Sequence, residues 1–170
     1  MKEGAVMNKK LWKIGEESWE LFLFTKKFFV ELFKPPFEFS ETVKQSFSIG
    51  YKSLGLVSIT GSIIGLTLAL QLIPTLAKFG AESLIPSMLS IAILREIGPV
   101  IISLICAGKM GSAIGAELGS MKVTEQISAM EVSAVNPFKY LVVTRVIATT
   151  LTVPILVIYS NALSLLGGYF

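Results

Sequence analysis

The sequence predicts an all-α membrane protein, in which an amphipathic helix along the membrane surface is followed by about three transmembrane helices. Three stretches, at 53–77, 83–108 and 146–170, contain no charged side chain except one adjacent Arg–Glu pair in the second. Each is long enough to cross a bilayer as a helix, for which about 20 apolar residues suffice. Hydrophobic residues make up 52% of the chain and charged residues only 16%, below the roughly 25% typical of soluble domains.

The N-terminal region, residues 1–52, is predicted to form an interfacial helix and an elbow before the first span. Charged residues recur at three- and four-residue spacing between Asn8 and Lys34. The residues left mostly on another face are Leu11, Trp12, Trp19, Phe22, Leu23, Phe29, Val30 and Phe33. Such a pattern is typical of a helix in the headgroup plane. The alternative is a solvent-facing helix packed on a partner protein. Pro35 and Pro36 should end the helix, because proline lacks the backbone donor.

Residues 53–170 form the predicted transmembrane domain, with spans near 53–77, 84–112 and 140–165. Lysines cluster before the first span, and only Lys78 lies between the first two spans. The cations that follow the second span are Lys109, Lys122, Lys139 and Arg145. Because Lys and Arg concentrate in cytoplasmic loops, the N-terminus and the 113–139 connection are expected in the cytoplasm and the 78–83 link outside.

Several chemistries are excluded by residues that the sequence lacks. It contains no histidine and no aspartate, so a histidine-assisted nucleophilic triad and the usual zinc sites are absent. A single cysteine, Cys106, allows no disulfide framework. The net charge of +3 would suit nucleic acid, but the cations flank hydrophobic segments and form no basic readout domain. No catalytic residue, metal site or nucleic-acid partner is predicted.

Glycines at four-residue spacing predict close helix packing. They are Gly61 and Gly65 in the first span, and Gly111, Gly115 and Gly119 from the end of the second span onward. Residues four apart share a helix face, and small residues there let another backbone approach closely. Both intramolecular packing and a contact between subunits remain open.

The pair Arg95–Glu96, followed by Pro99, is the predicted functional site. Ionic groups at this depth in a bilayer are costly and persist mainly where they face protein, water or a polar ligand. Pro99 removes one helical hydrogen bond and could open the helix beside the charges. The alternative is a structural pair that other helices neutralise.

The connection between the second and third spans predicts a short cytoplasmic helix. Thr124 is its expected N-cap, and Asn136–Pro137 ends the run. Ile127, Met130 and Ala134 form a narrow apolar stripe that would fit a groove on a partner. The alternative is a helix that only belongs to a surface loop.

Four runs of residues resemble one known family. They are LREIGPV at 94–100, AGKMGSAIGAELGSMKVTEQI at 107–127, and MEV at 130–132 with NPFKYLVVTR at 136–145. They are similar to the MlaE (YrbE) permeases of ABC transporters over roughly 54–170. The resemblance implies a multi-pass permease of the bacterial inner membrane that works as a homodimer with ATPase subunits. Such a permease moves phospholipid or a related lipid between that membrane and periplasmic MCE-domain proteins.

The resemblance also implies roles for individual residues. Arg95, Glu96 and Pro99 match the charged part of the second spanning helix, near the lipid pathway or its gate. The coupling helix that docks on the ATPase matches about 117–134, and its expected contacts are Glu117, Glu125, Gln126, Ile127, Met130 and Glu131. Because family members usually carry two further spanning helices, we expect this chain to lack the C-terminal helices of the pattern.

The ATPase is expected to be a separate chain. The sequence contains no G-x-x-x-x-G-K-[ST] phosphate loop, so ATP and magnesium would bind that partner and no cofactor is expected here. Two other classes stay open: a non-transporting membrane adaptor that anchors a complex, and a half-sized secondary transporter, whose inverted repeats are not found in three spans.

Overall fold

A computed structural model describes residues 2–35 and 37–169, without the side chains of 2–11 and 14, so the Leu11 side chain and Pro36 of the predicted N-terminal pattern lie outside it. The elements are α1 (Lys2–Leu32), α2 (Phe39–Lys78), the 3₁₀ turn η1 (Glu82–Leu84), α3 (Ile85–Ile91), the π-helical turn η2 (Ala92–Ile97), α4 (Gly98–Val123), α5 (Gln126–Val132), the π-helical turn η3 (Lys139–Val143) and α6 (Thr144–Tyr169). All of the secondary structure in the described ranges is helical. The predicted all-α class is therefore confirmed.

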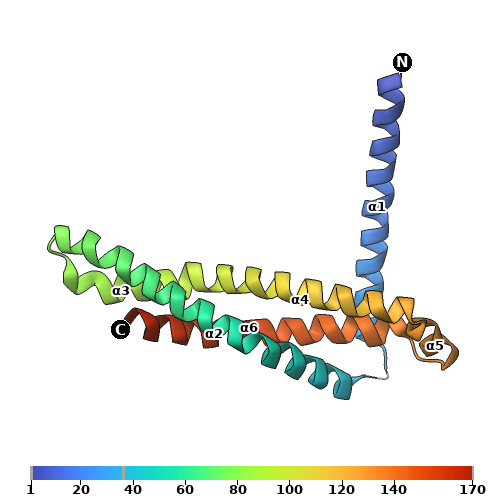
Figure 1. The fold of residues 1–170 in the computed structure, drawn as a ribbon. Helices are drawn as coiled ribbons and strands as arrows, with labels where there is room; N and C mark the ends of the chain where they lie inside the picture. The colour runs from blue at the N-terminus through green and yellow to red at the C-terminus, as the bar shows by residue number, and fades with distance from the viewer. Residues whose placement is uncertain (1, 36, 170) are drawn as a thin grey trace.

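Three helical stretches are long and apolar enough to cross a membrane, as predicted. They are Phe39–Lys78, Glu82–Val123 and Lys139–Tyr169. The three run side by side, with the turn between α2 and α3 at one end and α5 at the other (Figure 1). Each is longer than the stretch predicted from hydropathy alone, because the charged turns at the α5 end continue the helices past their apolar parts.

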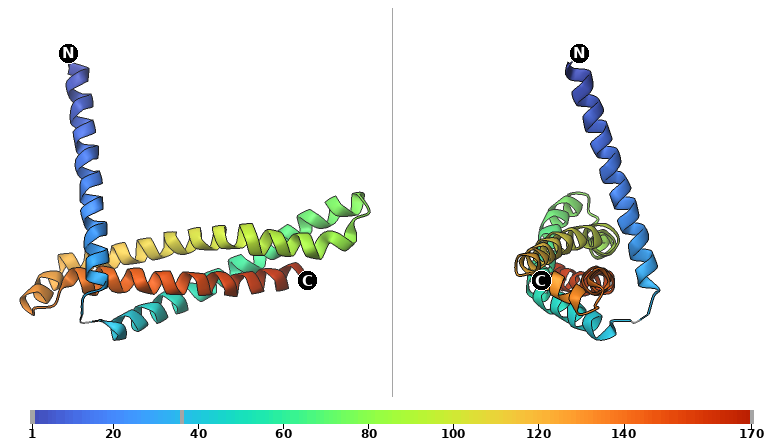
Figure 2. Two further views of the ribbon diagram at one scale, coloured as in Figure 1. Left: turned by 180° about the vertical axis from the view of Figure 1, so that it is seen from behind. Right: turned by 90° about the vertical axis from the view of Figure 1, so that its right-hand side faces the viewer.

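The helix α1 runs across the long axis of these three helices in every view (Figure 2). A helix in the membrane plane needs this direction if the others cross the bilayer. Its large apolar side chains are widely exposed, among them Trp12, Trp19 and Phe29. Interfacial placement stays a prediction, since no membrane is present. The helix ends at Leu32, three residues before Pro35.

The predicted boundary at residues 52 and 53 does not coincide with a break in the backbone. The helix α2 is continuous from Phe39 to Lys78 and passes through this point. The break lies earlier, in the segment between α1 and α2. Hydropathy marks the point in the sequence where charged residues stop. It does not mark a helix end, because a helix continues across such a point without a change of geometry.

The tightest packing joins α2 to α6 through small residues. A Cβ atom added at Gly61 would lie 3.0 Å from the Ser160 carbonyl oxygen, and one added at Gly65 would overlap the backbone of Ser164. The Ser164 hydroxyl donates a hydrogen bond of 2.7 Å to the Gly61 carbonyl oxygen. Only glycine permits this approach, and the resulting contact supplies dispersion and a buried hydrogen bond where lipid offers no hydrophobic driving force.

Two small apolar clusters complete the core. One joins α2, α4 and α6 through Val57, Ile102, Cys106, Met110 and Leu156. The other, Ala69, Leu89 and Ile93, lies toward the turn between α2 and α3. Most remaining large apolar side chains point outward, which suits a surface in contact with lipid or further protein.

Candidate functional site

The pair Arg95–Glu96 lies in the π-helical turn η2, inside the second spanning stretch. Pro99 follows this turn at the start of α4 and has no N–H to donate. A π-helical turn lengthens the hydrogen-bonded ring by one residue and often marks functional positions in helices. The helix therefore does not open into a gap at Pro99: it widens for about one turn and then continues as α4.

Both charged side chains point away from the core of this chain. Ile93, on the inner face of the turn, is fully buried, whereas Arg95 and Glu96 are exposed. Neither takes part in an ion pair within the described part of the chain. The alternative of a structural pair neutralised by the other helices of this chain therefore has no support. Lipid, water or another protein has to meet these charges.

A buried amide on α6 packs behind the charged turn. Asn161 is 8% exposed, and its Oδ1 atom has no hydrogen-bond partner among the described residues. This oxygen lies so close to Gly98 that a Cβ atom there would overlap it. Gly98 thus admits the amide beside the π-helical turn. Sequence patterns did not single out Asn161, because a lone asparagine in an apolar helix carries no spacing signal.

At the α5 end of the bundle, the predicted 117–134 helix is wrong in its boundaries. Its first part belongs to α4, which runs to Val123, and a separate helix, α5, covers Gln126–Val132. Thr124 is not the N-cap of α5: it ends α4, and its Oγ1 atom donates to the Ser120 carbonyl oxygen at 2.8 Å. Glu125 adopts a left-handed backbone with φ of 56° and turns the chain. A left-handed residue other than glycine is hard to foresee from sequence.

The apolar stripe on α5 differs from its predicted form. Ile127 and Met130 are half-buried, and Ala134 lies beyond the helix at a φ of 58°. The Ala134 and Val135 N–H groups donate to the Glu131 and Met130 carbonyl oxygens, both near 3 Å, a paired C-terminal cap in which glycine is the usual residue. The apolar groups left open are Val123 and Val132, at 84% and 90% exposure.

The polar residues expected to contact an ATPase fall into two groups. Gln126 and Glu131 are exposed on α5. Glu125, the residue just before α5, accepts a 2.7 Å hydrogen bond from the Ser128 hydroxyl. Glu117 instead sits on α4, where its Oε1 atom lies 2.9 Å from Nη2 of Arg145 on α6.

Arg145 ties the start of α6 to α4. Its side chain is 4% exposed, and Nη1 donates at 2.9 Å to the Leu141 carbonyl oxygen within η3. The arginine therefore occupies a carbonyl at the π-helical turn and pairs with Glu117 at the same time. The sequence marks Arg145 as a topology signal and as part of the family resemblance, but nothing in the linear pattern joins it to Glu117.

The glycine ladder on α4 is not packed against any of the residues that the structure describes. A Cβ atom added at Gly111, Gly115 or Gly119 would meet nothing within 4 Å in the described structure. Gly111 also lines a groove of about 490 Å³ between α4 and α6, together with Ala107, Ile114, Val153 and Pro154. Intramolecular packing thus accounts for Gly61 and Gly65, and leaves the α4 ladder open for another helix.

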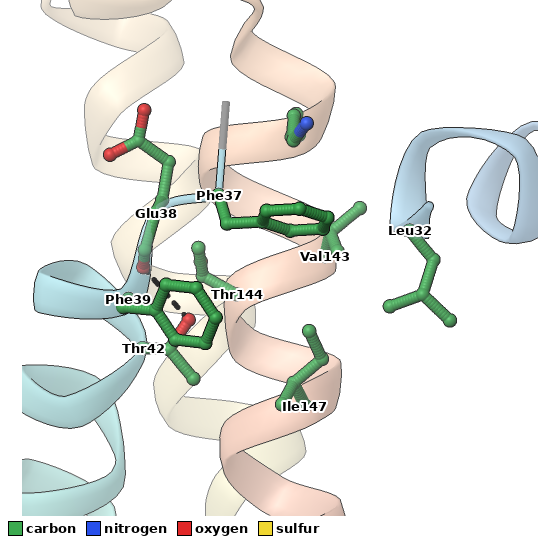
Figure 3. Close-up of a pocket in the computed structure, with 9 residues that line it drawn as sticks. Leu32, Phe37, Glu38, Phe39, Thr42, Val143, Thr144 and Ile147 are labelled. Carbon is green, nitrogen blue, oxygen red and sulfur yellow. Dashed lines mark hydrogen bonds between the residues drawn. The ribbon is translucent and has the colours of Figure 1, made fainter. Parts of the chain in front are cut away.

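A small hollow lies beneath the elbow between α1 and α2. Its volume is about 70 Å³. Figure 3 shows Leu32 of α1 facing Phe37, Val143 and Ile147 across it, while the Glu38 carboxylate points away. The lining is mainly aliphatic and aromatic, so the hollow holds no arrangement suited to chemistry.

Comparison with known proteins agrees with this architecture. A family model described as "Permease MlaE" matches residues 42–170. A probable ABC transporter permease protein of Rickettsia bellii is 35% identical over 96% of this chain and 63% of its own length. The intermembrane phospholipid transport system permease protein MlaE of Haemophilus influenzae is 39% identical over 74% of this chain and 48% of its own. The chloroplastic protein TRIGALACTOSYLDIACYLGLYCEROL 1 of Arabidopsis thaliana is 36% identical over 75% of this chain and 36% of its own.

The matches cover the charged π-helical turn, the packed helices and the α5 connection together. The chain spans between about half and two-thirds of the length of the curated relatives that head this group. It is a multi-pass α-helical membrane protein, and it belongs to the MlaE permease family.

Proposed function

We propose that this chain is the permease subunit of an ATP-driven transporter that moves phospholipid, or a related lipid, between the bacterial inner membrane and a periplasmic MCE-type protein. Support comes from the family and from the name of the Haemophilus relative, which describes intermembrane phospholipid transport. The chain spans only part of such relatives, so substrate and partners belong to the proposal.

The observation that carries the proposal is the exposed pair Arg95–Glu96 inside a spanning stretch. Each charge at this depth costs about 3 kcal/mol unless a polar group compensates it. Neither has an ion-pair partner among the described residues. A phospholipid headgroup carries a phosphate, which arginine binds well as a charged acceptor. The two side chains, with Pro99 holding the π-helical turn, would form part of the lipid pathway or its gate.

The remaining roles follow from the two ends of the bundle. The α5 end would be cytoplasmic and dock on a separate ATPase that binds ATP and magnesium, with Gln126, Glu131 and exposed Val132 at the contact. The open glycines on α4 would pack against a second copy of the permease. The turn between α2 and α3 would face the periplasmic MCE-type protein.

Replacing Glu96 with glutamine in the reconstituted complex tests the proposal. Lipid transfer between liposomes should fall by about tenfold, equivalent to about 1.4 kcal/mol, because one of the two charges that would line the lipid pathway is lost. The matched control is Glu82→Gln, which removes an exposed carboxylate from the turn before α3. Normal transfer by the Glu96 variant, at normal amounts in the membrane, would contradict the proposed pathway. If the wild-type complex binds its ATPase but transfers no lipid, the chain acts as an adaptor.

A further inference from the structure

The segment 136–139 directly follows the α5 cap and turns its side chains toward α1. Asn136 Nδ2 donates a 3.3 Å hydrogen bond to Glu31 Oε2 on α1. The Phe138 ring packs edge-on against Phe24, with 5.1 Å between centroids, and Lys27 Nζ lies 4.5 Å from the Phe138 centroid. One short segment therefore meets α1 through a hydrogen bond, an aromatic contact and a cation–π contact.

The same segment also holds the chain that follows α1. The Lys139 side chain is 8% exposed, its ammonium group donates to the Lys34 carbonyl oxygen, and it lies 5.6 Å from the Phe37 ring centroid. Asn136 also bonds to the first two residues of η3, since its Oδ1 atom accepts the Lys139 N–H at 3.4 Å and its carbonyl oxygen accepts the Tyr140 N–H at 3.1 Å. The contacts to α1 and the start of α6 thus share residues.

The path from this segment back to α5 is short and hydrogen-bonded. Ser133, Ala134 and Val135 are the only residues between α5 and Asn136, and the N–H group of each donates to a carbonyl oxygen of α5. In the other direction, η3 is the only element of the described chain against which α1 makes more than isolated contacts. Figure 1 places α5 and the lower end of α1 at the same end of the bundle.

We propose that residues 136–139 form a joint that holds α5 at a fixed position relative to α1, with Phe138 and Asn136 as positioning residues. A helix lying in the membrane surface and the helix that would dock on the ATPase then move as one unit. The proposal rests on the proposed function for its effect on transport, while the joint itself can be tested without it. The effect would be on how much lipid is moved for each ATP hydrolysed.

Cysteine cross-linking tests the joint in native membranes. Because Cys106 is the only cysteine, Cys106→Ala gives a cysteine-free background. Glu31→Cys with Asn136→Cys should cross-link with a short bifunctional reagent, since their side chains meet at 3.3 Å. Glu20→Cys with Asn136→Cys is the matched control: position 20 lies on the same helix three turns away and should not react. Equal cross-linking of the two pairs would overturn the joint.

Phe138→Ala tests the consequence. In the complex with the ATPase, the amount of lipid transferred per ATP hydrolysed should fall by about fivefold, which corresponds to the free energy of one aromatic contact. Phe138→Tyr keeps the ring and should retain the wild-type ratio. Phe24→Ala removes the opposing ring while leaving 136–139 intact, and should lower the ratio to the same extent. It provides the test if Phe138→Ala folds poorly. An unchanged ratio in both alanine variants, or an equal loss in Phe138→Tyr, would overturn the proposal.

A spin label at Ser133→Cys separates this result from the proposed function. Ser133 is exposed beside α5, and its label should become more mobile in Phe138→Ala but not in Phe22→Ala, which removes an exposed α1 ring outside the joint. This difference in label mobility can be measured whether or not the complex transports lipid. If it is observed while the wild-type complex moves no lipid, the joint stands and the proposed function fails. If mobility is the same in all three proteins, the joint is wrong.

Discussion

At the scale of single residues, two glycines of α2 have opposite surroundings. Gly65 lies against the backbone of Ser164, whereas a Cβ atom added at Gly55 would meet nothing within 4 Å in the described structure. The same substitution should therefore have opposite effects at the two positions, although both lie in one helix.

Gly65→Ala should destabilise the protein by about 1–3 kcal/mol, because the new methyl group forces α2 and α6 apart. Gly55→Ala should be neutral or stabilise by up to about 1 kcal/mol, since alanine loses less entropy in a helix. Unfolding of the two variants in mixed detergent micelles gives both values. Equal stability of the two variants would contradict the packing of α2 on α6.

Glu117 and Arg145 are the second pair to consider at this scale, because one partner is buried and the other is about half exposed. A double-mutant cycle with Glu117→Gln and Arg145→Met should give a coupling energy of about 1–2 kcal/mol, less than for a fully buried pair. The exposed pair Lys13–Glu17, at 3.9 Å, should give less than about 0.5 kcal/mol. If the two cycles agree, Glu117 is free to contact an ATPase instead.

At the scale of elements, hydropathy located the spans but not their ends. A run of apolar residues identifies a spanning helix because the bilayer requires it. It does not reveal that α2 begins at Phe39 or that α4 reaches Val123, because both helices continue through residues that carry charged side chains. The Glu117–Arg145 pair and the packing of Asn161 against Gly98 beside η2 depend on contacts between distant parts of the chain. No local pattern of residues encodes such contacts.

The exposed valines beside α5 lead to a prediction about this element. Val132→Asp should reduce the amount of ATPase that co-purifies by about tenfold, because a carboxylate loses its hydration in an apolar contact without compensation. Ser133→Asp adds the same charge at the next residue without removing an apolar group and should retain the ATPase. Similar retention of ATPase by both variants would mean that α5 docks through another face or is only part of a loop.

At the scale of the whole molecule, its two ends differ in charge. The turn between α2 and α3 carries Lys78 and Glu82, whereas α1, the start of α2 and the α4–α6 connection carry most of the cations. All three of the latter regions gather at one end of the bundle (Figure 1). Charge asymmetry along the sequence thus becomes charge asymmetry between two faces of a membrane protein, which is the form in which the positive-inside rule acts.

This arrangement predicts that the α5 end is cytoplasmic and that the turn after α2 faces outward. Phe79 is 80% exposed and suits labelling there better than Gly80, whose φ of 65° disfavours other residues. In the Cys106→Ala background, Phe79→Cys should react with a membrane-impermeant maleimide in intact cells stripped of their outer membrane. Lys122→Cys, exposed at the end of α4, should react only after the inner membrane is permeabilised. The reverse pattern would place α5 on the side that lacks ATP, and docking on an ATPase would then be impossible for this chain.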